Sequence, residues 1–282
     1  MISAAFRRQF RATAALEIAD GLRSRWLVFA TVVDLLLVGI FVFAGMHESQ
    51  VFGFTGMNRV MFSCSHALVV ILPLLALAAT GQVIGQARST GTLEFLFSNP
   101  LTRPTYFLAV TAVRLLLLIG PLVVVFGSCA LVSRFYFQEA LDIAFMARTL
   151  AVCSAELIAF TGIGMLISAT VRHPARTLIS ILLVWAASIA LLDLALIGLL
   201  LQWRLDPQSV FLLAALNPVQ DARLALLAGG DPELATLGPV GFFLANRLGN
   251  ASLLAIGLLW PIVVGTLCWW AGLRSFRRHD LL

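Results

Sequence analysis

Six long apolar runs constrain this chain more than any other feature. A helix needs about 20 consecutive apolar residues to cross a bilayer, and each run reaches that length. Of the 282 residues, 60% are hydrophobic and 12% charged, whereas a soluble domain carries about 25% charge. The sequence therefore predicts an all-α polytopic membrane protein, a single transmembrane domain over residues 1–282. The predicted spans are 27–46, 60–84, 106–132, 145–171, 178–201 and 253–273.

The segments outside the spans have helical signals of their own. Residues 2–25 mix aromatic and aliphatic side chains with arginines, which predicts an amphipathic helix at the membrane interface. In the longest connection, 202–250, Asn217 is a helix cap, Pro218 suits the first helical position and Gly229-Gly230 ends a helix. We expect a short helix over 219–228 in an otherwise extracytoplasmic connection.

The distribution of arginine predicts the orientation. All 19 basic residues are Arg, and the net charge is +5. Twelve of them lie on the side of the two termini and of residues 82–103, whereas the short loops of the other side hold Arg59 and Arg134, with Arg148 near the edge. The positive-inside rule places both termini in the cytoplasm. The basic excess therefore does not require a nucleic-acid partner.

A polar stretch, residues 82–103, separates the second and third spans. Leu93, Leu96 and Phe97 share one face of a short helix, Glu94 in its first turn complements the helix dipole, and Pro100 ends it at Asn99. A one-faced helix outside the membrane either rests on lipid headgroups or occupies a groove of another protein. Its polar flanks favour the groove.

Sequence motifs argue against chemistry within the chain itself. No G-x-x-x-x-G-K-[ST] nucleotide loop occurs, and neither H-E-x-x-H nor G-x-S-x-G is present. The four His are scattered, which disfavours an intramembrane enzyme. An ion-driven secondary transporter stays open as an alternative, although no internal repeat of the kind common in such folds is evident.

The stretch between spans two and three resembles the ABC-2-type transporter permeases. The matching residues are Arg88, Gly91-Thr92-Leu93-Glu94 and Ser98-Asn99-Pro100-Leu101-Thr102-Arg103. The resemblance implies a non-catalytic subunit of a bacterial inner-membrane transporter, with two copies and a cytoplasmic ATP-binding subunit that holds ATP and Mg²⁺. In such a permease this helix is the coupling helix. The implied contacts with the ATP-binding subunit are Arg88, Thr92, Leu93, Glu94, Leu96, Phe97 and Asn99.

Three further stretches narrow the resemblance. Glu17–Trp26, Phe52–Thr55 and Asn217–Arg223 are similar to permeases of the transporter that matures nitrous-oxide reductase, a copper enzyme. This similarity implies an extracytoplasmic partner protein docked on residues 202–250. Gln86 departs from the family pattern, which usually has an acidic residue there.

Charged residues inside predicted spans are costly and should face a partner or water. Asp34 and Arg114 lie at similar depth from the cytoplasmic edge, so we expect either an ion pair between spans one and three or two separate polar contacts. Glu156 and Asp193 lie nearer the outer leaflet, where they line a path or, as we favour, bond neighbouring hydroxyl groups.

Soft ligands gather at the outer end of the second span. Met57, Met61 and Cys64 fall on one helical face, and thioether and thiolate groups suit Cu(I). No tight metal-ligand spacing is present, so ordinary apolar packing is the favoured interpretation and no bound metal or cofactor is expected.

Overall fold

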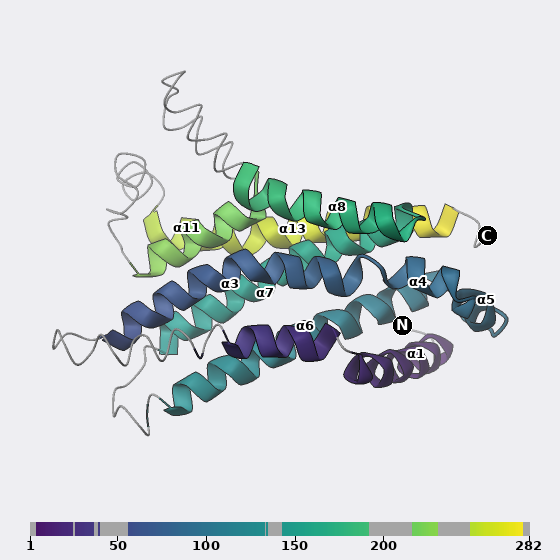
Figure 1. Ribbon diagram of the computed structural model, residues 1–282, viewed down its shortest axis with the longest axis horizontal. Coiled ribbons are helices and arrows are strands. Elements are labelled where there is room, and N and C mark those ends of the chain that lie inside the picture. Colours follow the sequence, from purple (N-terminus) through teal and green to yellow (C-terminus); the bar gives the residue numbers. More distant parts are fainter. Residues whose placement is uncertain are drawn as a thin grey trace, which may run out of the picture.

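Long, nearly parallel helices build the molecule (Figure 1). The computed structural model describes residues 4–24, 26–36, 39, 56–132, 134, 143–191, 216–230 and 249–278. The bundle contains α3 (Gly56–Thr80), α6 (Arg103–Val132), α7 (Ile143–Thr170) and α13 (Gly249–Arg278). Within the described residues, four segments are long and apolar enough to cross a membrane: Ser65–Ser89, Arg103–Ser128, Ile143–Thr170 and Ala251–Arg278. They coincide with the second, third, fourth and sixth predicted spans.

The two other predicted spans are described only in their first halves. An apolar helix covers Trp26–Leu36, and a second one is formed by α8 (Pro174–Ala186) with the π-helical turn η2 (Ala187–Leu191). The rest of both spans lies outside the described residues, apart from Gly39. The number six therefore stays a prediction.

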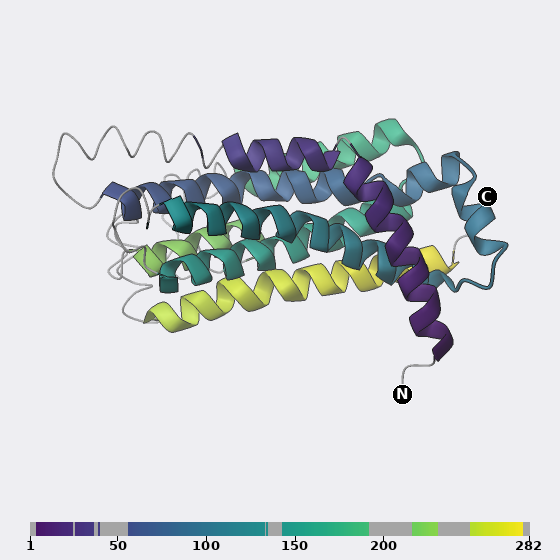
Figure 2. The same cartoon turned by 90° about the horizontal axis from the view of Figure 1, so that it is seen from below.

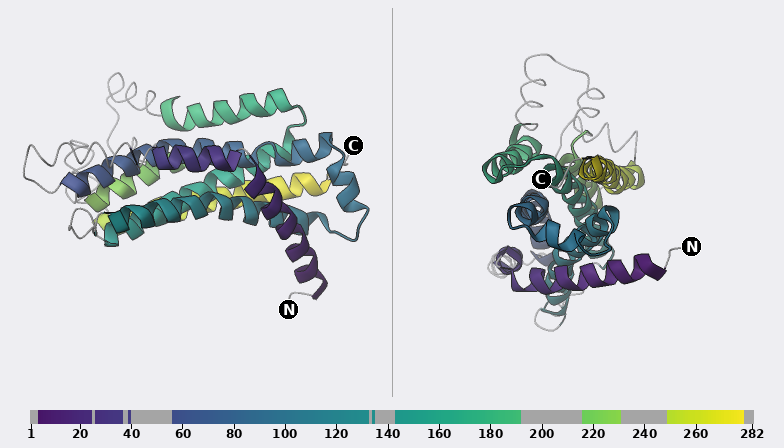
Figure 3. Two further views of the ribbon diagram at one scale, coloured as in Figure 1. Left: turned by 60° about the horizontal axis from the view of Figure 1, so that its bottom comes forward. Right: turned by 90° about the vertical axis from the view of Figure 1, so that its right-hand side faces the viewer.

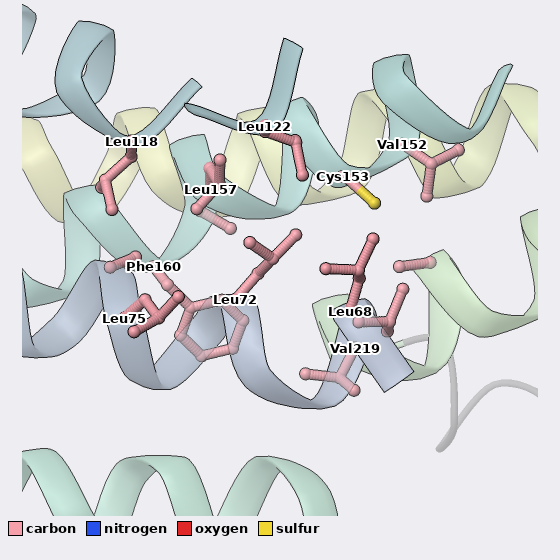
Figure 4. Close-up of a cluster of buried hydrophobic side chains, with 14 of the residues drawn as sticks. Leu68, Leu72, Leu75, Leu118, Leu122, Val152, Cys153, Leu157, Phe160 and Val219 are labelled. Carbon is pink, nitrogen blue, oxygen red and sulfur yellow. The ribbon is translucent and has the colours of Figure 1, made fainter. Parts of the chain in front are cut away.

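Helix α7 lies at the centre of the bundle. It is buried along most of its length and packs against α3, α6, α11 and α13. Figure 4 shows its contribution to the core, where leucines of α3 and α6 meet its inner face. The labelled residues are Leu68, Leu72, Leu75, Leu118, Leu122, Val152, Cys153, Leu157, Phe160 and Val219. In lipid such helices associate through close packing, because the surrounding tails are as apolar as leucine.

Two glycines allow α7 and α13 to touch backbone to backbone. A Cβ atom added at Gly162 would lie 2.1 Å from the carbonyl oxygen of Gly265, and one added at Gly265 would lie 2.5 Å from that of Ile158. Neither side has a flexible side chain that could move aside. Small residues at a crossing are the usual means of close approach between membrane helices.

The connection between the last two predicted spans contains α11 (Pro218–Gly230). The predicted cap is confirmed, since the backbone N–H of Val219 donates to Oδ1 of Asn217 over 3.2 Å. Unlike a surface helix, α11 packs into the bundle against α13, α7 and α3. It buries Val219, Ala222 and Leu226, at the end opposite the termini (Figure 1).

Helix α1 (Ala4–Arg23) crosses the bundle instead of running along it (Figures 2 and 3). It packs against α6, where the Cβ of any residue replacing Gly21 would lie 2.3 Å from Cδ1 of Leu117. The crosswise direction fits the prediction of an interfacial helix.

The glycine crossing predicts a strong effect of one methyl group. Gly162→Ala should destabilise the chain by about 1–3 kcal/mol, because the added carbon meets backbone atoms on α13. The loss should appear as a lower melting temperature of the purified chain in detergent. Gly120→Ala on α6 is the matched control, since nothing lies within 4 Å of its added Cβ. Equal melting temperatures for the two variants would contradict the crossing.

Candidate coupling site

Two short helices, α4 (Val83–Ser89) and α5 (Thr92–Phe97), connect α3 to α6 at the end that carries both termini (Figure 1). The helix of the second span is interrupted at Gly81 and Gln82, and the backbone N–H of Ile84 donates to Oγ of Ser168 over 2.9 Å. Helix α5 begins after Gly91, whose φ of 70° is the left-handed conformation that glycine adopts without steric cost.

The inner face of α5 is fixed to its own chain. Leu93 is 1% exposed, and the Phe97 ring packs edge-on against Tyr106 at 5.8 Å and against Phe276 at 6.3 Å between centroids. Leu96 lies partly buried at the edge of the same cluster. These aromatic contacts join α5 to the beginning of α6 and the end of α13, so the three elements form one packed unit.

The outer face of α5 is free among the described residues. Thr92, Glu94 and Asn99 are exposed, and the Phe95 side chain is 72% exposed. The predicted contact residues are therefore divided between two faces, because Leu93 points into the bundle. Phe95 was missed, since only the apolar face formed by Leu93, Leu96 and Phe97 was considered.

Hydrogen bonds hold the α5–α6 connection from two sides. Nη1 of Arg103 donates to the carbonyl oxygens of Phe276 and Arg277, the latter over 3.1 Å, near the end of α13. Nε2 of Gln9 on α1 donates to the carbonyl oxygen of Pro100. The α5–α6 connection is thereby joined to both α13 and α1.

Positive charge collects beside this unit. Arg88 on α4 is half-buried, and its Nε and Nη2 have no hydrogen-bond partner among the described residues. Arg103 and Arg172 lie near enough to repel it. The predicted partner contact at Arg88 therefore belongs to a surface that would attract an acidic group.

Of the two alternatives for Asp34 and Arg114, the ion pair between them is wrong, because Arg114 pairs with acids of α1 instead. Nη2 of Arg114 lies 3.4 Å from Oε2 of Glu17 and 4.0 Å from Oδ2 of Asp20, both on α1. The guanidinium also lies over the Trp26 ring, 5.3 Å from its centroid. Burial raises the pKa of Glu17 and Arg114 opposes this effect. The pairing was missed because it depends on α1 lying across α6.

Asp34 and Glu156 are two further charged residues within predicted spans whose expected hydrogen bonds are absent among the described residues. Asp34 is buried, and its Oδ1 has no hydrogen-bond partner among the described residues. Both carboxylate oxygens of Glu156 also have no hydrogen-bond partner among the described residues, so the favoured contact with a hydroxyl group is absent from them. The positive charge of Arg223 on α11 is close enough to attract the Glu156 carboxylate. Asp193 lies outside the described residues. Asp221 on α11 is a further buried acid, missed because its helix was expected outside the bundle.

The copper hypothesis is not tested by the structure. Met57, Met61 and Cys64 belong to α3, but their side chains are outside the described residues. Among the side chains that are described, no group of three or more His, Cys, Asp or Glu is arranged to hold a metal.

Comparison with known proteins identifies the class. The model of the ABC-2 family transporter proteins matches residues 11–281, and the chain belongs to that family. It is a multi-pass membrane protein, as the family and the four spanning helices indicate.

Two relatives make the similarity more specific. The chain is 30% identical over 225 residues to the probable ABC transporter permease protein NosY of Pseudomonas aeruginosa. The aligned region covers 78% of this chain and 82% of the relative. It is 26% identical over 227 residues to the protein of the same name from Stutzerimonas stutzeri, with 79% and 82% covered.

The Arg114 cluster predicts unequal roles for its two acids. Glu17→Gln should destabilise the chain by about 3 kcal/mol, because it leaves a buried guanidinium without its main counter-charge. Asp20→Asn is the control and should cost about 0–1 kcal/mol, since the Asp20 side chain is 80% exposed. Thermal unfolding in detergent measures both, and equal losses would count against the assigned pairing.

Proposed function

We propose that this chain is the transmembrane subunit of an ABC transporter and that α5 is its contact with a separate ATP-binding subunit. The carrying observation is the division of α5 into a face packed on the bundle and an exposed face with Phe95 at its centre. Family membership and the NosY relatives support the proposal.

The geometry suits transmission of force. Leu93 and Phe97 seat α5 on α6 and α13, so a push on its outer face moves packed helices and not a loose loop. ATP and Mg²⁺ would bind to the partner, whose closure tilts the attached helices as rigid bodies. Two copies of this chain would form the translocation unit. The chain itself would carry no catalytic group.

The same proposal fixes orientation and location. The end that carries α5 and both termini would face the cytoplasm of a bacterium, with α11 towards the outside of the inner membrane. The arginine distribution supports this orientation. A role in maturing a copper enzyme, with an extracytoplasmic partner protein, is proposed from the resemblance to NosY-like permeases alone.

The partner contact should depend on the outer face of α5. Phe95→Ala should weaken association with the co-expressed ATP-binding subunit about 30-fold or more, because exposed aromatic anchors contribute about 2 kcal/mol or more to such interfaces. Glu94→Arg should also weaken it. Co-purification and quantitative binding in detergent measure the effect.

Two controls separate loss of contact from loss of fold. Val124→Ala removes an equally exposed apolar side chain far from α5 and should leave association unchanged. Leu93→Ala should instead lower the melting temperature, since it empties a buried position. Retention of the partner by both Phe95→Ala and Glu94→Arg would refute the proposed contact, as would failure of any ATP-binding subunit to associate with the native chain.

Orientation has its own test. In a background without the four native cysteines, Ser89→Cys places an exposed thiol at the end of α4. A membrane-impermeant maleimide should label it in inside-out vesicles and not in intact cells. Labelling in intact cells would place α5 on the wrong side for an ATP-driven subunit.

A further inference from the structure

A pocket of about 280 Å³ lies between α6, α7 and α13, and no residue of α5 lines it. Its lining includes Leu108, Ala112 and Leu115 of α6 and the glycine pair Gly162 and Gly265. The glycines contribute no side chains, so the close crossing of α7 and α13 leaves a hollow beside α6. Trp269 of α13 also lines it, and its Nε1 donates to Oγ1 of Thr111 over 2.9 Å, which bridges α13 to α6.

One polar atom in this pocket stands out. Thr161 lines it and is 1% exposed, yet its Oγ1 has no hydrogen-bond partner among the described residues. Other threonines in these helices behave differently: the hydroxyls of Thr111 and Thr149 donate to the carbonyl four residues earlier. A buried hydroxyl without a partner costs free energy, so a ligand oxygen that bonds it would be favoured.

The chemistry of the pocket restricts its occupant. None of the residues that line it is charged, and its walls belong to three helices of membrane-spanning length. Ligand pockets typically hold about 300–1,000 Å³, so this one admits part of a lipid and not a whole one. A phosphate or carboxylate would find no counter-charge.

We propose that this pocket binds one acyl chain of a bilayer lipid, with a carbonyl or hydroxyl oxygen at Thr161. The site is separate from the α5 contact and does not depend on an ATP-binding partner. It would hold a resident lipid on the α6–α13 side of each chain.

The test uses the full chain in phosphatidylcholine nanodiscs with two photoreactive probes. One is a diacylglycerol with a diazirine in an acyl chain, and the other is a diazirine-bearing alkane without oxygen. Mass spectrometry of cross-linked peptides should show labelling at Leu108–Leu115 and Gly265–Trp269 that exceeds labelling around Val124 at least fivefold. Val124 is an exposed residue of α6 that does not line the pocket.

Matched variants distinguish the pocket from ordinary lipid contact. Ala112→Trp on the exposed rim should remove the excess labelling, whereas Val124→Trp should not. Thr161→Val keeps the shape and removes the hydroxyl, so it should reduce diacylglycerol labelling about 2- to 10-fold and leave alkane labelling unchanged. Uniform labelling of all lipid-facing residues would overturn the site, and equal effects of Thr161→Val on both probes would overturn the role of the hydroxyl.

Discussion

The backbone contact between α7 and α13 at Gly162 and Gly265 is the constraint on which the described bundle depends. It fixes the position of α13 beside the buried central helix, and thereby the place of Phe276 at the end of α13. That ring is part of the cluster on which α5 rests. A contact deep in the bundle thus determines how a short helix is presented at its end.

The end of the bundle that carries α5 is held by both aromatic packing and hydrogen bonds. Phe97 and Tyr106 fit α5 to α6, while Arg103 and Gln9 fasten the connection to α13 and α1 through backbone carbonyls. Because these hydrogen bonds are accepted by backbone carbonyls, they depend on the path of the chain more than on which side chains are present at the accepting residues. Helix α1 therefore belongs to the same packed unit as α5, although Gln9 lies 91 residues before Pro100 in the sequence.

Much of the helical architecture could be predicted, because apolar length and helix-end signals are local properties. The cap at Asn217 and the beginning of α5 after Gly91 are examples. Pairing across the fold could not be predicted. Depth within a span suggested Asp34 as the partner of Arg114, but the crosswise path of α1 brings Glu17 closer. The packing of α11 into the bundle was missed for a related reason, since a helix of 13 residues is too short to span a bilayer and was expected outside the bundle.

The interruption at Gly81 and Gln82 has a mechanical consequence. The Ser168 hydroxyl accepts a hydrogen bond from the backbone N–H of Ile84. This bond reduces the free-energy cost of interrupting a helix in an apolar environment, where an unpaired backbone N–H is unfavourable. The break separates α3 from α4, and α4 is held by the central helix, since Ile84 belongs to the same buried cluster as Met165 and Ala169 of α7. Force applied to α5 would therefore reach the central helix by a short route through α4, without passing along α3.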